Sequence, residues 1–151
     1  MIRLSKLSDY AVVIMTALSG ARPTKLNATD VSAATGIPQT TVAKLLGHLA
    51  RADLLESHRG HNGGFALSRD PEAISIADII EAVDGPISLT NCIDDGNSSC
   101  SITSLCGMRP RWQIMNQAVR QAFEGVSLAE MAQPAAFFDV EAPLEAQSAR
   151  G

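Results

Sequence analysis

Three cysteines gathered in one short segment constrain this chain more than any other feature. Cys92, Cys100 and Cys106 are all of its cysteines, spaced C-x(7)-C-x(5)-C, and the residues between them are mostly Ser, Asn, Asp, Thr and Gly. Such a segment has too few apolar side chains to fold by burial, and a loop this long in a small domain is usually functional or disordered. Because thiolates bind soft centres such as zinc and iron–sulfur clusters, the segment favours a metal or cluster site.

Two other interpretations of the cysteines stay open. They could be inert apolar side chains, although their neighbours are polar. They could also form one disulfide and leave one spare thiol, since their number is odd. The spacing matches neither a C-x-x-C zinc pair nor the ferredoxin patterns, so spacing alone does not name the metal.

The net charge of −4 hides an asymmetry along the chain. Residues 1–69 carry eight Lys and Arg against four Asp and Glu, whereas residues 70–151 carry four against twelve. The three histidines, His48, His58 and His61, also lie in the first part. This division is typical of a DNA-reading module joined to a sensing or pairing module. A length of 151 residues fits one domain with an extra element.

The apolar run at residues 11–18, preceded by Arg3 and Lys6, loosely imitates a secretory signal. Asp9 interrupts the apolar pattern, and the helical period from Leu4 to Leu18 indicates an amphipathic helix instead. No apolar stretch reaches the ~18–20 residues that cross a membrane. We expect a cytoplasmic protein, where thiols stay reduced.

The first half predicts a helix-turn-helix. A first helix runs from Ser5 or Ser8 to Ser19, and Asn27-x-x-Asp30 resembles a capping box that starts a short helix through Ala34. A Thr-Gly turn then leads through Pro38 into a helix that ends near Ala52. Away from its apolar face this last helix carries polar residues suited to the major groove, although any solvated helix face carries such residues. They are Gln39, Thr40, Thr41, Lys44 and His48.

A small hairpin follows the presumed recognition helix. Residues 54–57 and 65–68 predict two strands, and the turn between them contains three glycines, Arg59 and two histidines. We expect Arg59 and His61 to reach DNA, because Arg is favoured at phosphates and in minor grooves. An ordinary hairpin is the alternative, but this tip is unusually basic. The fold class is therefore mainly α with a small β-hairpin wing, a winged helix-turn-helix.

The acidic half predicts two further helices on either side of the cysteines. Ser75 caps a helix with an apolar stripe, and Pro110, at a first-turn position, starts a long helix from about Arg109 to Glu124. Apolar residues cover more than one face of the long helix, so we expect it to form a homodimer; packing within one chain is the alternative. The expected organisation is a DNA-binding domain (1–85), a cysteine loop (86–108), a dimerisation helix with a short turn (109–131) and a disordered tail (132–151).

These residues resemble the winged-helix iron–sulfur transcriptional regulators that include IscR and NsrR. The resemblance covers about residues 1–131. An opening run at residues 4–11 looks like the sub-branch that regulates the SUF iron–sulfur assembly operon. The motifs that carry the resemblance are Leu4-Ser-Lys-Leu-Ser-Asp9-Tyr10-Ala11, Gly36-Ile37-Pro38, Arg59-Gly60-x-x-Gly63-Gly64-Phe65-x-Leu67, Asp78-Ile-Ile-Glu-Ala-Val83-Asp-Gly85 and the three cysteines.

The resemblance implies a cluster held by Cys92, Cys100 and Cys106 near a dimer interface. The chain departs from the family in two ways: the first cysteine gap is seven residues where five is commoner, and Arg109 stands where many relatives have a histidine ligand. A guanidinium stays protonated and cannot bind a metal. Asp9 matches the position where some relatives supply a carboxylate from the partner's first helix, so we expect it to be the fourth ligand. The alternative is an acid that favours the helix N-terminus.

The resemblance implies a repressor that senses cluster status and controls iron–sulfur assembly genes. The opening run favours a two-iron (2Fe-2S) cluster, and an acidic fourth ligand favours a four-iron (4Fe-4S) cluster and a nitric-oxide sensor. A zinc-stabilised interaction module is the alternative from another class. An enzyme is not expected, and neither is a small-molecule substrate, because no histidine is near the cysteines in sequence and the Gly63-Gly64 pair lies between strands.

Overall fold

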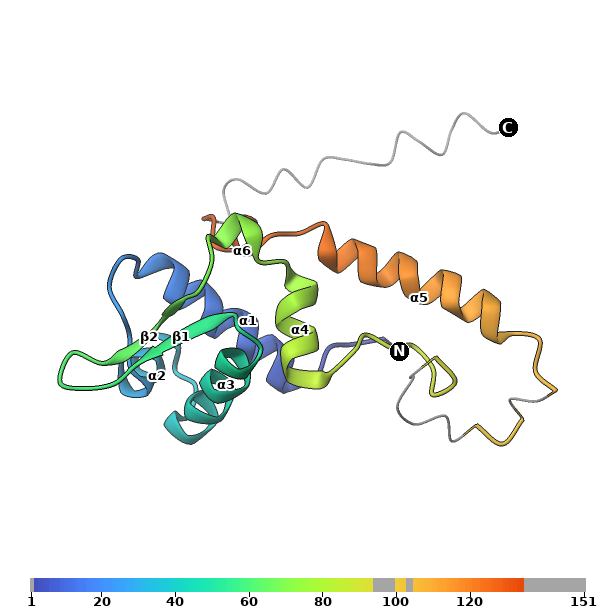
Figure 1. Ribbon diagram of the computed structural model, residues 1–151, viewed down its shortest axis with the longest axis horizontal. Coiled ribbons are helices and arrows are strands. Elements are labelled where there is room, and N and C mark those ends of the chain that lie inside the picture. Colours follow the sequence, from blue (N-terminus) through green and yellow to red (C-terminus); the bar gives the residue numbers. More distant parts are fainter. Residues whose placement is uncertain (1, 94–99, 103–104, 135–151) are drawn as a thin grey trace, which may run out of the picture.

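A helical body carries one long projecting helix in the computed structural model, which describes residues 2–93, 100–102 and 105–134 (Figure 1). The mainly α class with a two-stranded antiparallel wing is confirmed. The predicted tail, 132–151, lies outside the described residues from residue 135 onward. The elements are α1 (Lys6–Gly20), α2 (Ala28–Thr35), α3 (Gln39–Arg51), β1 (Leu55–His58), β2 (Gly64–Leu67), the 3-10 turn η1 (Pro71–Ala73), α4 (Ile76–Asp84), α5 (Arg109–Glu124) and α6 (Leu128–Met131).

Local capping explains where the first helices begin. Ser5 accepts a hydrogen bond from the Ser8 amide at 3.0 Å and so starts α1. Asn27 and Asp30 form the predicted reciprocal box at the start of α2, with bonds of 2.9 and 3.1 Å. α2 ends at Gly36, whose φ of +75° suits glycine and turns the chain toward α3.

The core of the body lies between α1, α3 and α4. Each helix contributes one apolar stripe, and burying a Leu or Ile side chain contributes about 1.5–3 kcal/mol. Ser8 is fully buried, and its hydroxyl donates to Asp84 at 2.7 Å, which ties α1 to α4. The fully buried side chains of the three helices include Ala11, Ile14, Met15, Val42, Leu45, Leu46, Leu49 and Ile79.

The wing is attached to the body through the loop between α1 and α2. β1 and β2 pair from Leu55 opposite Leu67 to His58 opposite Gly64. Leu26 forms an antiparallel bridge with Phe65: the Leu26 amide donates to the Phe65 carbonyl at 3.1 Å, and the Phe65 amide donates to the Leu26 carbonyl at 2.8 Å. A Cβ on Gly64 would lie 2.9 Å from the Leu26 carbonyl, so only glycine permits this approach.

After α5 the chain returns to the body. Leu128 of α6 is fully buried in the same core as α1, α3 and α4. Two backbone bonds hold this return: the Leu128 amide donates to the Ile74 carbonyl at 2.8 Å, and the Ile76 amide donates to the Val126 carbonyl at 2.9 Å. The short turn after the long helix therefore packs with the DNA-binding body, although it follows α5 in the chain.

Candidate DNA-binding face and cysteine segment

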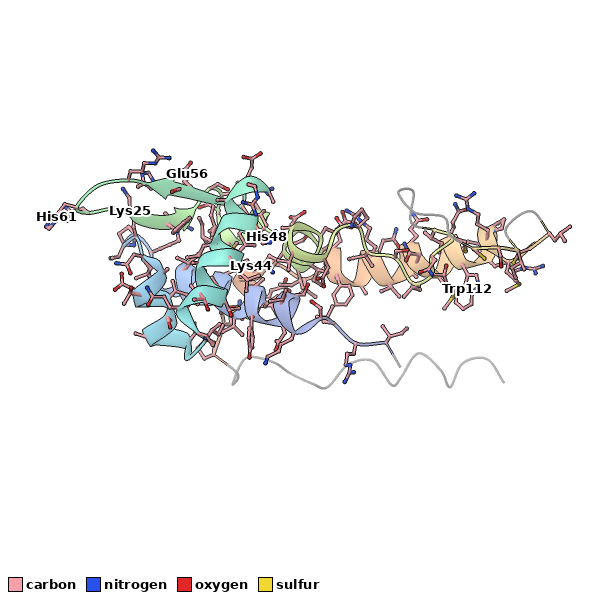
Figure 2. All side chains as sticks on the ribbon, turned by 90° about the horizontal axis from the view of Figure 1, so that it is seen from below. Lys25, Lys44, His48, Glu56, His61 and Trp112 are labelled. Atoms are coloured by element: carbon pink, nitrogen blue, oxygen red, sulfur yellow. The ribbon has the colours of Figure 1, made fainter. Side chains whose placement is uncertain are left out.

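The outward face of α3 carries the residues predicted to read DNA. Gln39, Thr40 and Lys44 are exposed, whereas Thr41 and His48 are half-buried. The Gln39 amide donates to the Thr29 hydroxyl of α2 at 2.9 Å, so it also joins the two helices. Figure 2, which looks onto α3, shows Lys44 and His48 along this helix. The arrangement offers one cation and several polar groups to a groove.

The wing extends the same side of the molecule. Arg59 and His61 are exposed in the turn between the strands, and Figure 2 shows His61 at the outer end of the wing. His58 is half-buried, with Nε2 3.6 Å from a carboxylate oxygen of Glu56. Arg59 and His61 are therefore exposed at the tip of the wing, where another molecule could contact them.

Two further basic residues that the sequence did not indicate, Arg51 and Lys25, lie on the same side of the molecule as α3 and the wing. Arg51 is exposed, and its guanidinium lies over Gly47, where an added Cβ would be 3.5 Å from Nη1. The spacing from Thr40 through Lys44 and Gly47 to Arg51 puts these four on one stripe, and this spacing could have indicated Arg51. Lys25 is exposed just before Leu26, and Figure 2 shows it between the wing tip and α3. No sequence signal marked it.

The cysteine segment lies apart from the DNA-binding face. It follows α4 and leads into the start of α5, which projects from the body (Figure 1). Cys92, Cys100 and Cys106 are each half-buried, and Cys92 and Cys106 are free thiols that form no disulfide with each other. The Thr90 hydroxyl lies 3.2 Å from the Cys92 sulfur.

The described residues of this chain do not bring a metal-binding set together. Within 2–93, 100–102 and 105–134, no three His, Cys, Asp or Glu side chains are grouped so as to hold a metal ion. Asp9 is exposed on α1, in the body rather than at the cysteines. The donor chemistry nevertheless fits a soft centre, because three thiols lie in one segment.

Helix, turn, helix and wing together define the winged-helix DNA-binding proteins. The sequence model of the Rrf2 family, described as an iron-dependent transcriptional regulator, matches residues 4–134. The chain therefore belongs to the Rrf2 family, whose members are transcription regulators and not enzymes. Among the described helices, none combines the length and apolar character that crossing a membrane requires.

Two relatives and two solved structures illustrate the likeness. The chain is 34% identical over 133 residues to Rv1287 of Mycobacterium tuberculosis, named as an HTH-type transcriptional regulator, over 86% of this chain and 81% of that protein. It is 25% identical over 118 residues to the regulator NsrR of Bacillus subtilis, over 78% and 79%. It resembles CymR, the global cysteine regulator of B. subtilis, with a TM-score of 0.69, 25% identity and coverage of 87% and 97%. The fold also matches T. potens IscR, with a TM-score of 0.65, 21% identity and coverage of 86% and 85%.

Proposed function

We propose that this protein is a dimeric repressor whose DNA affinity depends on an iron–sulfur cluster bound by Cys92, Cys100 and Cys106. The observation that carries the proposal is the position of the three thiols. They share one segment outside the core, at the start of the helix best placed to pair two copies. The family description, an iron-dependent transcriptional regulator, supports a metal-linked role. We expect a two-iron cluster, with a four-iron cluster as the alternative.

DNA recognition follows from the geometry of α3 and the wing. Thr40, Thr41 and Gln39 lie near the start of α3 and would meet base edges, while Lys44 and His48 follow along the helix. Arg59 and His61 would meet phosphates or a minor groove from the wing. Basic groups on this face also explain how a chain with a net charge of −4 can bind DNA.

The dimer would form through α5. None of its residues is buried within one chain. Its body-facing side carries Asn116, Val119, Arg120 and Phe123, all half-buried. The opposite side exposes large apolar side chains, among them Ile114 at 69% and Met115 at 54%. Ala118 and Ala122, spaced like Ile114 at four-residue intervals, let a second helix approach closely.

A two-fold dimer offers a reason why the described residues of one chain do not bring a complete metal site together. If two α5 helices pack antiparallel, the start of one helix lies beside the end of the other. Near the end of α5, Asp9 borders an apolar pocket of about 270 Å³ that Phe123 and Met131 also line. The partner's cysteine segment would therefore arrive close to Asp9, which we propose as the fourth ligand. An Asp9→Ala variant with an unchanged cluster spectrum and cluster lifetime would remove Asp9 from the site.

A bound cluster would supply a cross-link among the thiolates that oxidants and nitric oxide can destroy. The cysteines that hold the cluster would keep their segment in one arrangement, and that arrangement would fix the angle between α5 and the two winged-helix bodies. That angle sets the spacing of the two α3 helices against two DNA half-sites. The opening run at residues 4–11 favours iron–sulfur assembly genes as the targets. A nitric-oxide-responsive repressor is the nearest alternative.

Replacing all three cysteines with alanine tests the coupling. We expect iron and sulfide to fall to background and operator affinity to differ from that of the cluster-loaded protein by about 5–150-fold, the usual range of allosteric coupling. Fluorescence anisotropy on one DNA duplex at one salt concentration measures the affinity. Ser98→Ala and Ser99→Ala, changes in the same segment, serve as the control. Equal affinities for cluster-loaded wild type and the alanine variant would contradict the coupling.

A thiol-based or zinc-stabilised regulator without a cluster is the second candidate. The free thiols at Cys92 and Cys106 favour it, as does the likeness to a cysteine regulator, CymR. Protein that stays colourless after anaerobic reconstitution and carries one zinc per chain would select the zinc form. Colourless, zinc-free protein whose DNA affinity responds to thiol oxidation would select the thiol switch.

A further inference from the structure

The attachment of α5 to the body contains a polar clamp that the sequence did not reveal. The nitrogen and the oxygen of the Asn116 side-chain amide both form hydrogen bonds to the main chain of residues 87–89. Its Nδ2 donates to the Ile87 carbonyl at 2.8 Å, and its Oδ1 accepts from the Leu89 amide at 2.9 Å. Because both partners are main-chain groups, residues 87–89 cannot shift along α5 without breaking these bonds. Leu89 lies three residues before Cys92.

A second contact joins the same helix to α4. Arg120 lies one turn beyond Asn116 and binds Glu81 with two nitrogens, Nε at 2.9 Å and Nη2 at 3.3 Å. Nη1 also donates to Glu124 at 3.1 Å. The pKa of Arg120 is raised, first by its hydrogen bond to Glu81 and the charge of Glu81, and then by the charge of Glu124. The two-nitrogen geometry fixes direction as well as distance.

Glu81 connects these two contacts. Its Oε1 also accepts from the Ile87 amide at 3.4 Å, so α4, α5 and the start of the cysteine segment meet at one carboxylate. α4 in turn packs against α1 and α3 in the core. Hydrogen bonds therefore lead from the residues just before Cys92 to α4, and packing of α4 against α3 continues the path to the helix that faces DNA.

We propose that Asn116 is the positioning residue through which the state of the cysteine segment reaches the DNA-binding body. This inference rests on the proposed function and adds the residue that transmits it. When the segment rearranges, the clamp moves α5 with residues 87–89, and the Arg120–Glu81 pair carries that movement to α4. Coupling is a difference in DNA affinity between two protein states, so the test compares the cluster-loaded and cluster-free forms.

The first experiment uses full-length Asn116→Leu, which keeps the approximate size and removes both hydrogen bonds. The ratio of operator affinities between the cluster-loaded and cluster-free forms is measured for wild type and variant, with iron and sulfide assayed on each sample. For wild type we expect the two affinities to differ by about 5–150-fold. We expect the variant to keep its cluster, but its two affinities should differ by no more than about twofold. Gln117→Leu, the same change at an exposed neighbouring position, should keep the wild-type ratio.

The outcomes separate the two proposals. A wild-type ratio of one contradicts the proposed function, whatever Asn116 does. A normal wild-type ratio that Asn116→Leu retains, with a normal cluster, overturns the role of Asn116. If that variant does not fold, Asn116→Asp replaces it, because it keeps the acceptor for Leu89 and loses the donor to Ile87; an unchanged ratio there also overturns the inference.

A measurement on cluster-free protein provides a check that does not depend on cofactor. Hydrogen exchange of the Leu89 amide should be about tenfold faster in Asn116→Leu, the loss expected for one hydrogen bond of about 1.4 kcal/mol. Amides of α1 and α3 should exchange at wild-type rates. Unchanged exchange at Leu89 would contradict the clamp itself.

Discussion

The winged-helix body and the α5 helix differ in how much of their apolar surface one chain buries. In the body, α1, α3 and α4 each bury an apolar stripe, and many of their side chains are completely covered. In α5 no residue is buried, and its attachment depends on a few half-buried residues, among them Asn116 and Arg120. The body therefore covers its apolar side chains within one chain, whereas α5 leaves large apolar side chains exposed, as a surface that pairs with another molecule does.

The largest effect we expect comes from placing a charge on the outward side of α5. Ala118→Glu would put a carboxylate from each chain into the proposed apolar interface, where an unpaired buried charge costs about 3–5 kcal/mol. Sedimentation equilibrium should show the dimer dissociating at least about 100-fold more readily. Gln117→Glu, the same charge one residue away, is the matched control. If the Ala118→Glu protein stays dimeric at the same concentrations, the two copies pair elsewhere.

Leu128→Ala tests where the body ends. Leu128 follows α5 in the chain but is fully buried with the body, so its truncation should lower the free energy of unfolding by about 2–5 kcal/mol. Urea denaturation monitored by circular dichroism gives this value. Met131→Ala, three residues on and 40% exposed, should cost much less. Equal losses in the two variants would mean that α6 is not part of the body's core.

Much of the fold could be predicted because its signals are local. The Asn27–Asp30 box, the Thr-Gly turn and Pro110 each mark a helix end within a few residues, and the predicted span Arg109–Glu124 is the observed one. The return of Leu128 to the core could not be predicted, because it depends on pairing with Ile74, 54 residues earlier. The Leu26–Phe65 pairing could not be predicted for the same reason, because its two residues are far apart in the chain.

The candidate site was predictable in composition but not in arrangement. The cysteines and the cations of α3 and the wing are visible as residue types in the sequence. The Asn116 clamp and the Glu81–Arg120 pair join residues 27 to 39 positions apart, so the helical periodicity of the sequence does not predict them. The roles of the cysteines and of Asp9 stay predictions, because the proposed cluster and the proposed second chain would both contribute groups from outside one chain.

The smallest effect that we expect is on operator affinity, when Arg59 in the wing is replaced. Arg59→Ala should weaken operator binding by about 1 kcal/mol, roughly fivefold, and reduce the slope of log affinity against log salt by about 0.9 if Arg59 meets one phosphate. Titrations at several salt concentrations measure both quantities. Arg22→Ala is the control, because Arg22 is paired with Asp70 at 3.0 Å. A lower affinity with an unchanged slope would assign Arg59 to a base or to folding of the wing instead.

The most direct test of the central claim is the visible absorbance of protein purified without oxygen, with iron and acid-labile sulfide assayed per chain. We predict brown protein that contains iron and sulfide in equal amounts, and their number per chain separates a two-iron from a four-iron cluster. Protein that is colourless as purified and remains so after anaerobic reconstitution would contradict a cluster at Cys92, Cys100 and Cys106.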